Sequence, residues 1–251
     1  MKRYYYDLHI HSCLSPCGDD DNTPNNIAGM AKLNGLDIVA LTDHNTTKNC
    51  PAFFNAAKHY GIVPVAGMEL TTSEDIHVVC LFESLTDATE FDKFIESKRT
   101  LIKNRPDIFG NQLILDNEDN VIGNEEFLLS NATSISIDAV TETVNRYNGI
   151  CYPAHIDRDS NGIVAVLGTI PTDLHFSAFE IHSKEKIDAL CDRFSINKEN
   201  VIVSSDAHYL TDISEADSFL LLPDADNEHD ELIRSELFKL LRGGCNERVV
   251  T

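Results

Sequence analysis

The chain has 251 residues, and its 41 acidic and 20 basic side chains give a formal charge of −21. Such a charge repels phosphodiester backbones over most of a surface, which argues against generic binding to nucleic acid or to anionic membranes. A phosphorylated substrate would therefore need a local positive group to hold it. The seven cysteines are an odd number spread along the chain, and no signal peptide or long apolar run precedes them, which predicts a reduced, cytoplasmic protein.

Apolar runs of strand length recur along the chain, with helix-like segments between most of them. Seven strands are predicted, at 4–10, 36–42, 62–68, 76–82, 149–154, 176–181 and 201–204. Three helices are predicted. The first begins at Thr23-Pro24, where a threonine N-cap precedes an N1 proline, the second runs from Pro51 to Gly61, and the third runs from Ser136 to Asn148. This alternation predicts a parallel sheet, open or closed into a barrel, in a single domain over 1–251.

One connection is too short for a parallel crossover. Between Leu70 and Ile76 the chain has only "TTSED", so the third and fourth runs form either a hairpin or a tight excursion. A hairpin places His77 beside Glu69. A second small hairpin is predicted at 111–123, within an insertion at 105–135 that serves either as a lid over a site or as surface decoration.

Side chains of the kinds that bind metals follow nearly every predicted strand. They are His9, His11, Asp43, His44, Glu69, His155, His182, Asp206 and His208. In a closed parallel α/β barrel the carboxyl ends of the strands form one face, so these residues are expected to converge there. Each one alone reads more readily as a structural residue, and it is their coincidence that predicts a metal site.

The expected donors are imidazoles and carboxylates, which suit Zn, Mn or Fe and disfavour a four-cysteine zinc site. There are more of them than one ion can use, so at least two ions are expected, with Glu69 able to bridge them. Closely spaced ions lower the pKa of a shared water and neutralise charge on a phosphoryl group. A metal-bridging hydroxide could then hydrolyse a phosphate ester near neutral pH.

Three further residues near this face have more than one interpretation. Cys13 and Cys17 are read as inert or redox-exposed thiols rather than ligands of a soft metal, because no second cysteine pair accompanies them. Arg158 follows His155 by three residues. It either binds phosphate through its guanidinium fork or forms a surface ion pair with one of its acidic neighbours, Asp157 and Asp159.

With these residues identified, the chain resembles the PHP family, the polymerase and histidinol phosphatase domains. The matching motifs are "DLHIHS" at 7–12, "LTDHN" at 41–45, "GMEL" at 67–70, "IHVV" at 76–79, "PAH" at 153–155 and "SSDAH" at 204–208. The resemblance implies a distorted (β/α)7 TIM-like barrel and two or three divalent metal ions. It assigns His9, His11, Glu69 and Asp206 to one ion, Glu69, His77 and His155 to a second, and His44 and His208 with an acidic residue to a third.

The chain departs from the family pattern at that acidic residue. Many relatives read "HSxxSDGxxTP", whereas this loop is longer and reads "HSCLSPCGDDDNTP". Counting back four residues from Thr23 identifies Asp19 as the ligand, and Asp20 is an equally good candidate. His182 has no firm motif match and is expected to contact the substrate or support the cluster, and Asp43 is expected to orient an imidazole.

The expected function is a metal-dependent phosphoesterase acting on a small phosphorylated metabolite. Asp206, His208 and Arg158 are expected to take part in catalysis, and Arg158 and His182 to contact the substrate. The acidic surface favours a monoester over nucleic acid. The alternatives are a metal-dependent hydrolase of amide-type bonds and a metal-binding domain without turnover. The substrate and the oligomeric state are left open by the sequence.

Overall fold

The computed structural model describes residues 1–224 and 230–243, so Cys245 lies outside it. The strands are β1 (Lys2–Ile10), β2 (Ile38–Leu41), β3 (Val63–Thr71), β4 (His77–Phe82), β5 (Leu113–Leu115), β6 (Val121–Asn124), β7 (Ile150–Pro153), β8 (Phe179–Glu180), β9 (Val201–Ile202) and β10 (Phe219–Leu222). The helices are α1 (Pro24–Leu33), α2 (Cys50–Tyr60), α3 (Leu85–Glu96), α4 (Pro106–Phe109), α5 (Ile137–Asn145), α6 (Ile163–Leu167), α7 (Ile187–Phe194) and α8 (Asp230–Leu241). The single-domain organisation over 1–251 remains a prediction.

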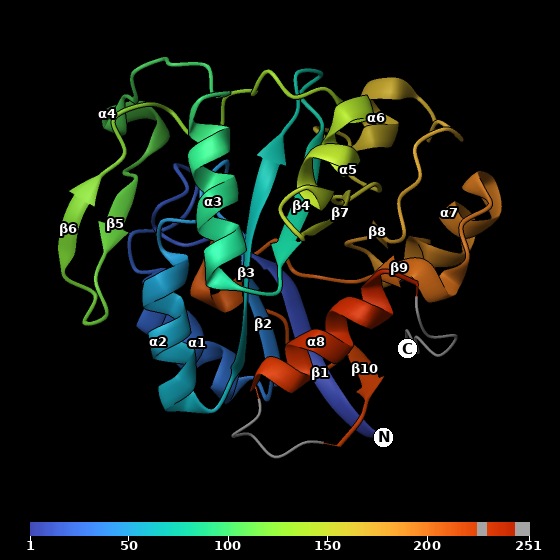
Figure 1. Ribbon diagram of the computed structural model, residues 1–251, viewed down its shortest axis with the longest axis horizontal. Coiled ribbons are helices and arrows are strands. Elements are labelled where there is room, and N and C mark those ends of the chain that lie inside the picture. The colour runs from blue at the N-terminus through green and yellow to red at the C-terminus, as the bar shows by residue number, and fades with distance from the viewer. Residues whose placement is uncertain (225–229, 244–251) are drawn as a thin grey trace.

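A curled six-stranded sheet forms the centre of the molecule, with the strand order β10-β1-β2-β3-β4-β7 (Figure 1). The pairs β1–β2 and β2–β3 are parallel, whereas β3–β4, β4–β7 and β1–β10 are antiparallel. The short parallel pair β8–β9 is a separate sheet that follows β7 in the chain.

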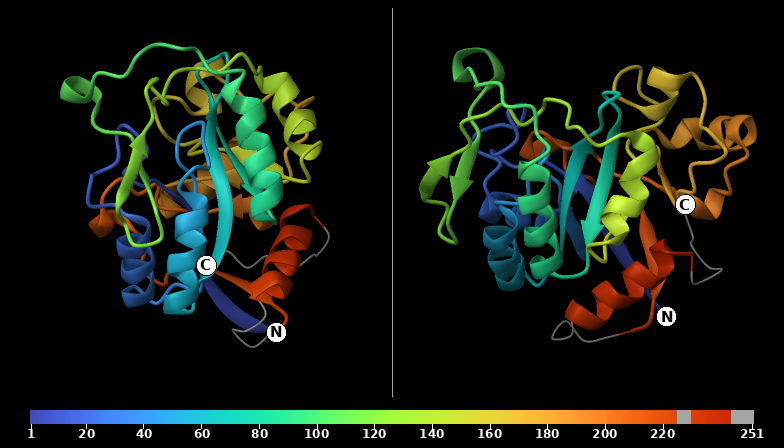
Figure 2. Two further views of the ribbon diagram at one scale, coloured as in Figure 1. Left: turned by 60° about the vertical axis from the view of Figure 1, so that its left-hand side comes forward. Right: turned by 45° about the horizontal axis from the view of Figure 1, so that its top comes forward.

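The two faces of the curled sheet bury different apolar clusters, because successive side chains of a strand point to opposite sides. Val39 and Met68 lie in the outer cluster, which also contains buried residues of α1, α2, α3 and α5. Ile38, Val65 and Leu81 lie in the inner cluster, which also contains the buried face of α8. The helices α1, α2, α3 and α5 stand along the outer side of the strands, and α8 lies across one end of the curl (Figure 2).

Local sequence signals explain where the main helices begin and end. Thr23 has extended backbone and accepts a hydrogen bond from Asn26 N, which caps α1 ahead of the N1 residue Pro24. Helix α2 ends at Gly61, whose φ of 66° places it in the left-handed region that favours glycine. Ser136 is the N-cap residue of α5, which ends at Arg146, before the predicted stop. The three predicted helices are therefore confirmed.

Both predicted hairpins are present. Strands β3 and β4 pair antiparallel with Thr71 opposite His77, and β5 pairs antiparallel with β6 in the insertion. The β5–β6 turn packs against α1, because Asp119 accepts a hydrogen bond from the side chain of Thr23. The short "TTSED" connection therefore brings His77 back toward Glu69, as expected.

The predicted distorted (β/α)7 TIM-like barrel is confirmed in part: the curled sheet is consistent with a distorted TIM-like barrel, but it does not close into a (β/α)7 barrel. The seven predicted strands and the two insertion strands are present, but β10 was not predicted. It pairs with the first half of β1, from Lys2 to Tyr5, and takes the edge that a closing strand would need. The segment after β9 contacts β1 through side-chain hydrogen bonds and through an isolated bridge between Ile10 and Ala207, but it forms no strand ladder with β1 within the described residues.

A membrane span was not expected from the sequence. Within residues 1–224 and 230–243, no helix combines the length and the apolar character needed to cross a bilayer.

Candidate metal centre

A bulge in β1 directs the first two histidines into the curl of the sheet. Tyr4, Tyr6 and Leu8 face the inner cluster, so strict alternation would turn His9 outward. The register against β2 shifts between Asp7 and Ile10, and Ile10 lies in the outer cluster. An extra residue of this kind reverses which side chains face inward. The Nε2 atoms of His9 and His11 consequently lie 3.2 Å apart in the interior.

Glu69 lies at the centre of the candidate site and is 1% exposed. Ring nitrogens of five histidines surround its two carboxylate oxygens, at 2.8 Å for His77, 3.1 Å for His44 and His155, 3.3 Å for His11 and 3.4 Å for His9. Asp206 Oδ1 adds a second carboxylate, 3.1 Å from His11 Nε2 and 3.3 Å from His9 Nε2. Residues from β1, β2, β3, β4, β7 and the segment after β9 therefore meet at one point.

The hydrogen bonds on the far side of the rings show which nitrogens are free to bind a cation. His9 Nδ1 lies 2.9 Å from Glu180 Oε1, and a carboxylate only accepts, so Nδ1 donates. His11 Nδ1 lies 2.9 Å from Ser15 Oγ, whose hydroxyl donates to Asp43, so this Nδ1 donates too. In the neutral rings both Nε2 lone pairs then point at carboxylates. Only a proton or a metal cation can occupy that space favourably.

Two further observations fit metal ions. His44 Nδ1 is buried and lies 3.1 Å from Glu69 Oε2, yet it forms no hydrogen bond with any described residue. Buried polar atoms of this kind are rarely left unsatisfied unless another group occupies the site. Three sets of ligand atoms lie within mutual reach: His9, His11, Glu69 and Asp206; His44, Glu69 and His77; and His11, His44 and His208. The residues present therefore fit divalent metal ions.

The histidines differ in electrostatic environment. Burial alone would lower the pKa of His9, but the charges of Glu180, Asp206 and Glu69 raise it well above the usual value. Burial opposes charging of His11 as well, and its hydrogen bonds to Asp206 and Glu69 raise its pKa to about 9. The two rings that face both carboxylates therefore experience the strongest negative potential in the site.

The pKa values of His44, His208 and the two carboxylates shift in the opposite direction. Burial lowers the pKa of His44 well below its usual value, and burial together with the charge of His11 lowers that of His208 to about 4. Although burial opposes ionisation, the neighbouring histidines hold the pKa values of Glu69 and Asp206 well below their usual range. The site thus holds ionised carboxylates beside the neutral imidazoles of His44 and His208, and both kinds of group are donors that divalent metals need.

The acidic residue expected at the third position is not brought into the cluster. Asp20 is exposed and accepts a hydrogen bond from Asn111 at 2.8 Å, and the carboxylate of Asp19 accepts one from Asp21 N. Within the described ranges, neither belongs to a set of ligand atoms in mutual reach. Cys17 lies near enough that burial and the charge of Glu69 raise its pKa to about 12, which keeps the thiol protonated.

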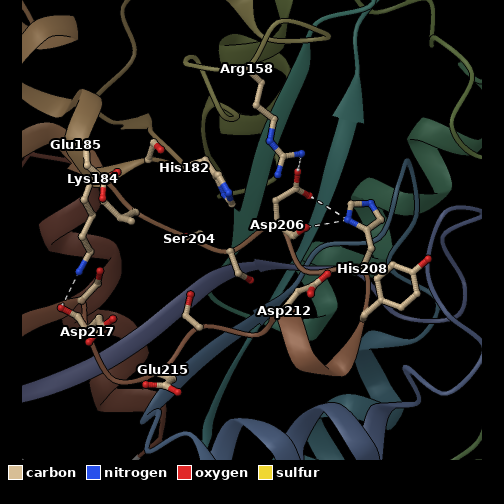
Figure 3. Close-up of a pocket in the computed structure, with 16 residues that line it drawn as sticks. Arg158, His182, Lys184, Glu185, Ser204, Asp206, His208, Asp212, Glu215 and Asp217 are labelled. Atoms are coloured by element: carbon tan, nitrogen blue, oxygen red, sulfur yellow. Dashed lines mark hydrogen bonds and ion pairs between the residues drawn. The ribbon is translucent and has the colours of Figure 1, made fainter.

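A cleft of about 720 Å³ opens beside the cluster and shares Arg158, Asp206 and His208 with a smaller cavity of about 120 Å³ over the ligands. Arg158 pairs with neither of its acidic sequence neighbours: its Nη1 lies 2.5 Å from Asp206 Oδ2 (Figure 3). His182 lines the cleft, and its backbone N–H is held by Asp157 at 2.8 Å. It therefore lines the cleft and does not belong to the sets of candidate ligands.

Hydrogen-bonded supports behind the ligands were only partly anticipated. Asp43 does orient an imidazole, as expected, but through Ser15: the Ser15 hydroxyl donates to Asp43 at 2.7 Å and accepts from His11. Ser15 and Glu180 were not singled out in the sequence, since a serine and a glutamate are unremarkable in a loop and in a short strand. Their closeness to His11 and His9 arises only in the folded chain.

Two candidate ligands have unusual backbone geometry. His155 has φ 29° and Asp206 has φ 52°, and both lie in the left-handed region that residues other than glycine seldom adopt. At His155, directly after β7, this conformation interrupts the alternation of the strand and turns the ring toward Glu69. Strained backbone of this kind concentrates at functional sites, where the surrounding structure holds it in place.

Comparison with known proteins identifies the family. A PHP domain match covers residues 7–159, more than half of the chain. An uncharacterized protein of Methanocaldococcus jannaschii is 37% identical over 76 residues, 27% of this chain and 44% of that protein. An error-prone DNA polymerase of Symbiobacterium thermophilum is 35% identical over 74 residues, 30% of this chain and 7% of that protein. The chain thus spans less than half the length of these curated relatives.

Solved structures share the fold at low sequence identity. The lesion-specific endonuclease Q of Pyrococcus furiosus has a TM-score of 0.63 and 16% identity, over 98% of this chain and 57% of that one. A putative metal-dependent phosphoesterase of Bifidobacterium adolescentis has a TM-score of 0.55 and 17% identity, over 92% and 96%. An amidohydrolase of Chromobacterium violaceum has a TM-score of 0.55 and 18% identity, also over 92% and 96%.

These comparisons correct one expectation. The formal charge of −21 was taken to argue against nucleic-acid substrates, yet endonuclease Q was solved with a duplex DNA substrate and DNA polymerases are among the relatives. That expectation is wrong, because a substrate responds to the local field of a site, and exposed charges further away are screened by salt. The motifs, the ligand geometry and the match over 7–159 lead to one identification: this chain belongs to the PHP domain family of metal-dependent hydrolases.

Proposed function

We propose that this protein is a metal-dependent phosphoesterase that hydrolyses a phosphate ester at the Glu69 cluster. One observation carries the proposal: five histidines and Asp206 surround the buried carboxylate of Glu69, and the lone pairs of His9 and His11 converge on two carboxylates. Apart from protons on the rings, divalent cations are the groups that satisfy so many converging nitrogen and oxygen lone pairs.

The ligand sets support two or three ions. His9, His11, Glu69 and Asp206 would hold one, Glu69 and His77 with His155 a second, and His44 and His208 a third, for which His11 offers the remaining donor. When bound, such ions lower the pKa of a coordinated water and neutralise charge on a phosphoryl group. Zn, Mn and Fe all suit this mixture of imidazole and carboxylate.

Residues around the two cavities support the handling of a phosphate ester. The cavity of about 120 Å³ is far smaller than a typical ligand pocket and suits a phosphoryl group, whereas the cleft of about 720 Å³ suits the rest of a substrate. Arg158 borders both, and its side chain is 36% exposed, so it can turn one edge of its guanidinium to phosphate oxygens. His182 lies along the cleft, where it would contact the leaving group.

For the substrate we favour a small phosphorylated metabolite, because the volume of the cleft is that of a small-molecule site. A nucleic-acid ester is the second candidate, favoured by the fold shared with endonuclease Q over nearly the whole chain. Amide hydrolysis is a third, since an amidohydrolase has the same fold. The six described cysteines form no disulfide, which agrees with the proposed cytoplasmic location.

The test compares four substrate classes on metal-loaded protein before and after chelation: a phosphate monoester, a phosphate diester, a phosphorylated oligonucleotide and a cyclic amide. We expect phosphoester cleavage that chelation abolishes and that His9→Ala or Asp206→Asn also abolishes while the fold is retained. His59→Ala is the matched control, because His59 is exposed on α2 and bonds only to its own helix. Bound metal without cleavage of any phosphoester, or unchanged turnover in either site variant, would contradict the proposal.

A further inference from the structure

A buried glutamate outside the expected ligand sets contacts two of the candidate ligands. Glu180 ends the short strand β8 and is 0% exposed. We propose that Glu180 is a positioning residue that fixes the metal-binding tautomer of His9 and the strained backbone of His155. The inference rests on the proposed metal centre. It gives a role to a residue of β8, a strand that none of the family motifs identified in the sequence includes.

The first contact selects one nitrogen of His9. Nδ1 lies 2.9 Å from Glu180 Oε1 and 3.0 Å from Oε2, so the ring faces the carboxylate fork. A carboxylate offers only acceptors, so Nδ1 carries the hydrogen and Nε2 keeps its lone pair. That lone pair points at Glu69 and Asp206, 3.4 Å and 3.3 Å away. A carboxylate behind a ligating imidazole is a recurrent support of metal sites, because it sets both the ring orientation and the basicity.

The second contact holds the backbone of His155. Its N–H donates to Glu180 Oε1 at 3.0 Å, and the next N–H, that of Ile156, donates to the Glu180 carbonyl at 2.9 Å. These two bonds hold the chain where φ of His155 is 29°, and His155 Nε2 lies 3.1 Å from Glu69 Oε1. One residue therefore supports two candidate ligands that approach the same oxygen, Glu69 Oε1.

The amide of a glutamine cannot replace this carboxylate. His155 N–H requires an oxygen at the Oε1 position, which leaves the amide NH₂ of Glu180→Gln facing His9 Nδ1. The amide oxygen could still accept from His9 Nδ1 at the 2.9 Å position, but the NH₂ would stand at the 3.0 Å position of Oε2, where it repels the same N–H, and the negative charge behind the ring would be gone, unless the ring moves its proton from Nδ1 to Nε2. Either outcome weakens or misdirects the lone pair that a metal needs. The substitution is nearly isosteric, so we expect the fold to persist.

The test measures metal binding and the His9 proton rather than turnover. Titration of metal-free protein with Co²⁺ should give a dissociation constant about 10- to 100-fold higher for Glu180→Gln than for wild type. The matched control Glu199→Gln removes the same charge from an exposed residue on the loop before β9, and it should bind Co²⁺ like wild type. Circular dichroism of the metal-free proteins checks that the fold is retained.

A second measurement does not depend on any variant folding. In Zn²⁺-loaded wild type with ¹⁵N-labelled histidine, NMR should show His9 with its proton on Nδ1 and none on Nε2. The reverse tautomer, or equal Co²⁺ affinities for wild type and Glu180→Gln, would overturn the assignment of Glu180 alone. Wild type that binds neither Co²⁺ nor Zn²⁺ would overturn the proposed function together with it.

Discussion

At the scale of single residues, the candidate site is organised around one carboxylate and one cation. Glu69 receives histidines from several strands, and Arg158 approaches the second carboxylate, Asp206, from the cleft. The ion pair compensates the charge of Asp206 on the side that faces the substrate. Arg158 is thus the described guanidinium best placed to meet a phosphoryl group, because it borders both the ligand cavity and the cleft.

Replacing Arg158 should weaken phosphate recognition without removing the ions. Arg158→Ala should lower kcat/KM for a phosphoester about 10- to 100-fold, since a charge-assisted hydrogen bond contributes roughly 1.5–3 kcal/mol. Arg158→Lys should recover part of the loss, because it restores the charge but not the fork. Steady-state kinetics with metal content measured in parallel tests this. Arg146→Ala, on an exposed helix face, is the control and should match wild type; equal kinetics for Arg146→Ala and Arg158→Ala would argue against the role.

At the scale of elements, the β3–β4 hairpin places Glu69 and His77 side by side and depends on close packing at Gly67. A Cβ at Gly67 would lie 2.8 Å from the Cys80 carbonyl oxygen and 2.8 Å from Leu81 Cδ2. The first of these atoms belongs to the backbone of the partner strand, so it cannot move without disturbing the ladder. The hairpin therefore tolerates no side chain at this point.

Gly67→Ala should lower the free energy of unfolding by about 1–3 kcal/mol, the usual effect of overpacking. It should also weaken metal binding, because Glu69 and His77 lie on the displaced strands. Gly123→Ala in β6 is the control: its Cβ would come no nearer than 3.8 Å to Ile114 Cδ1, and its effect should stay within about 0.5 kcal/mol. Urea denaturation gives the free energy of unfolding of both variants. If the Gly67→Ala protein were as stable as the Gly123→Ala protein, the β3–β4 pair would accommodate a side chain at residue 67 without loss of stability.

The insertion is joined to the rest of the fold by a partly buried ion-pair network. Glu125, 8% exposed, lies 2.6 Å from Lys48 Nζ and 3.3 Å from Arg99 Nη2. Burial alone would raise the pKa of Glu125, but hydrogen bonds and charges from these two cations lower it. A carboxyl with a lowered folded-state pKa stabilises the protein above its unfolded pKa of about 4.5, and that contribution disappears as the pH falls through the folded-state value.

Glu125→Gln should therefore cost about 2 kcal/mol of unfolding free energy at pH 7 and progressively less at pH values below about 4.5. Denaturation curves of both proteins across this range give the difference. The neighbouring Glu126→Gln is the control, because Glu126 is 61% exposed and pairs with Lys103, which is 77% exposed. A difference between wild type and Glu125→Gln that stays constant with pH would exclude the ion pairs as its source.

At the scale of the whole molecule, the site couples metal binding to stability. The ligands come from residues 9 to 208, so ions that bind only the folded chain should stabilise all of it. A divalent ion at a free concentration of a hundred times its dissociation constant adds about 2.7 kcal/mol to the free energy of unfolding. This corresponds to a Tm increase of about 5–10 °C for a chain of this size. Thermal unfolding with Mn²⁺ and with chelator tests this. The same increase in His9→Ala would show that the ions act elsewhere.

Much of this arrangement can be predicted from the chain itself. The order of strands, both hairpins and the caps of α1 and α2 follow from apolar periodicity and from the positions of threonine, proline and glycine, because these are local preferences. The ligand residues could also be selected, since imidazoles and carboxylates recur at strand ends. Local patterns of this kind depend on neighbours a few residues apart, so they can be recognised without knowledge of the fold.

The tertiary structure decided the rest. Alternation placed His9 and His11 on one side, but only the bulge against β2 turned that side inward. Pairing of β10 with β1 left the barrel open, the turn after Asp19 and Asp20 kept both from the ligands, and Glu180 reached His9 from far along the chain. These outcomes depend on which strand pairs with each edge of the sheet and on contacts between residues distant in sequence. No local pattern encodes such competition, so the sequence by itself determined the chemistry available and the fold determined where it acts.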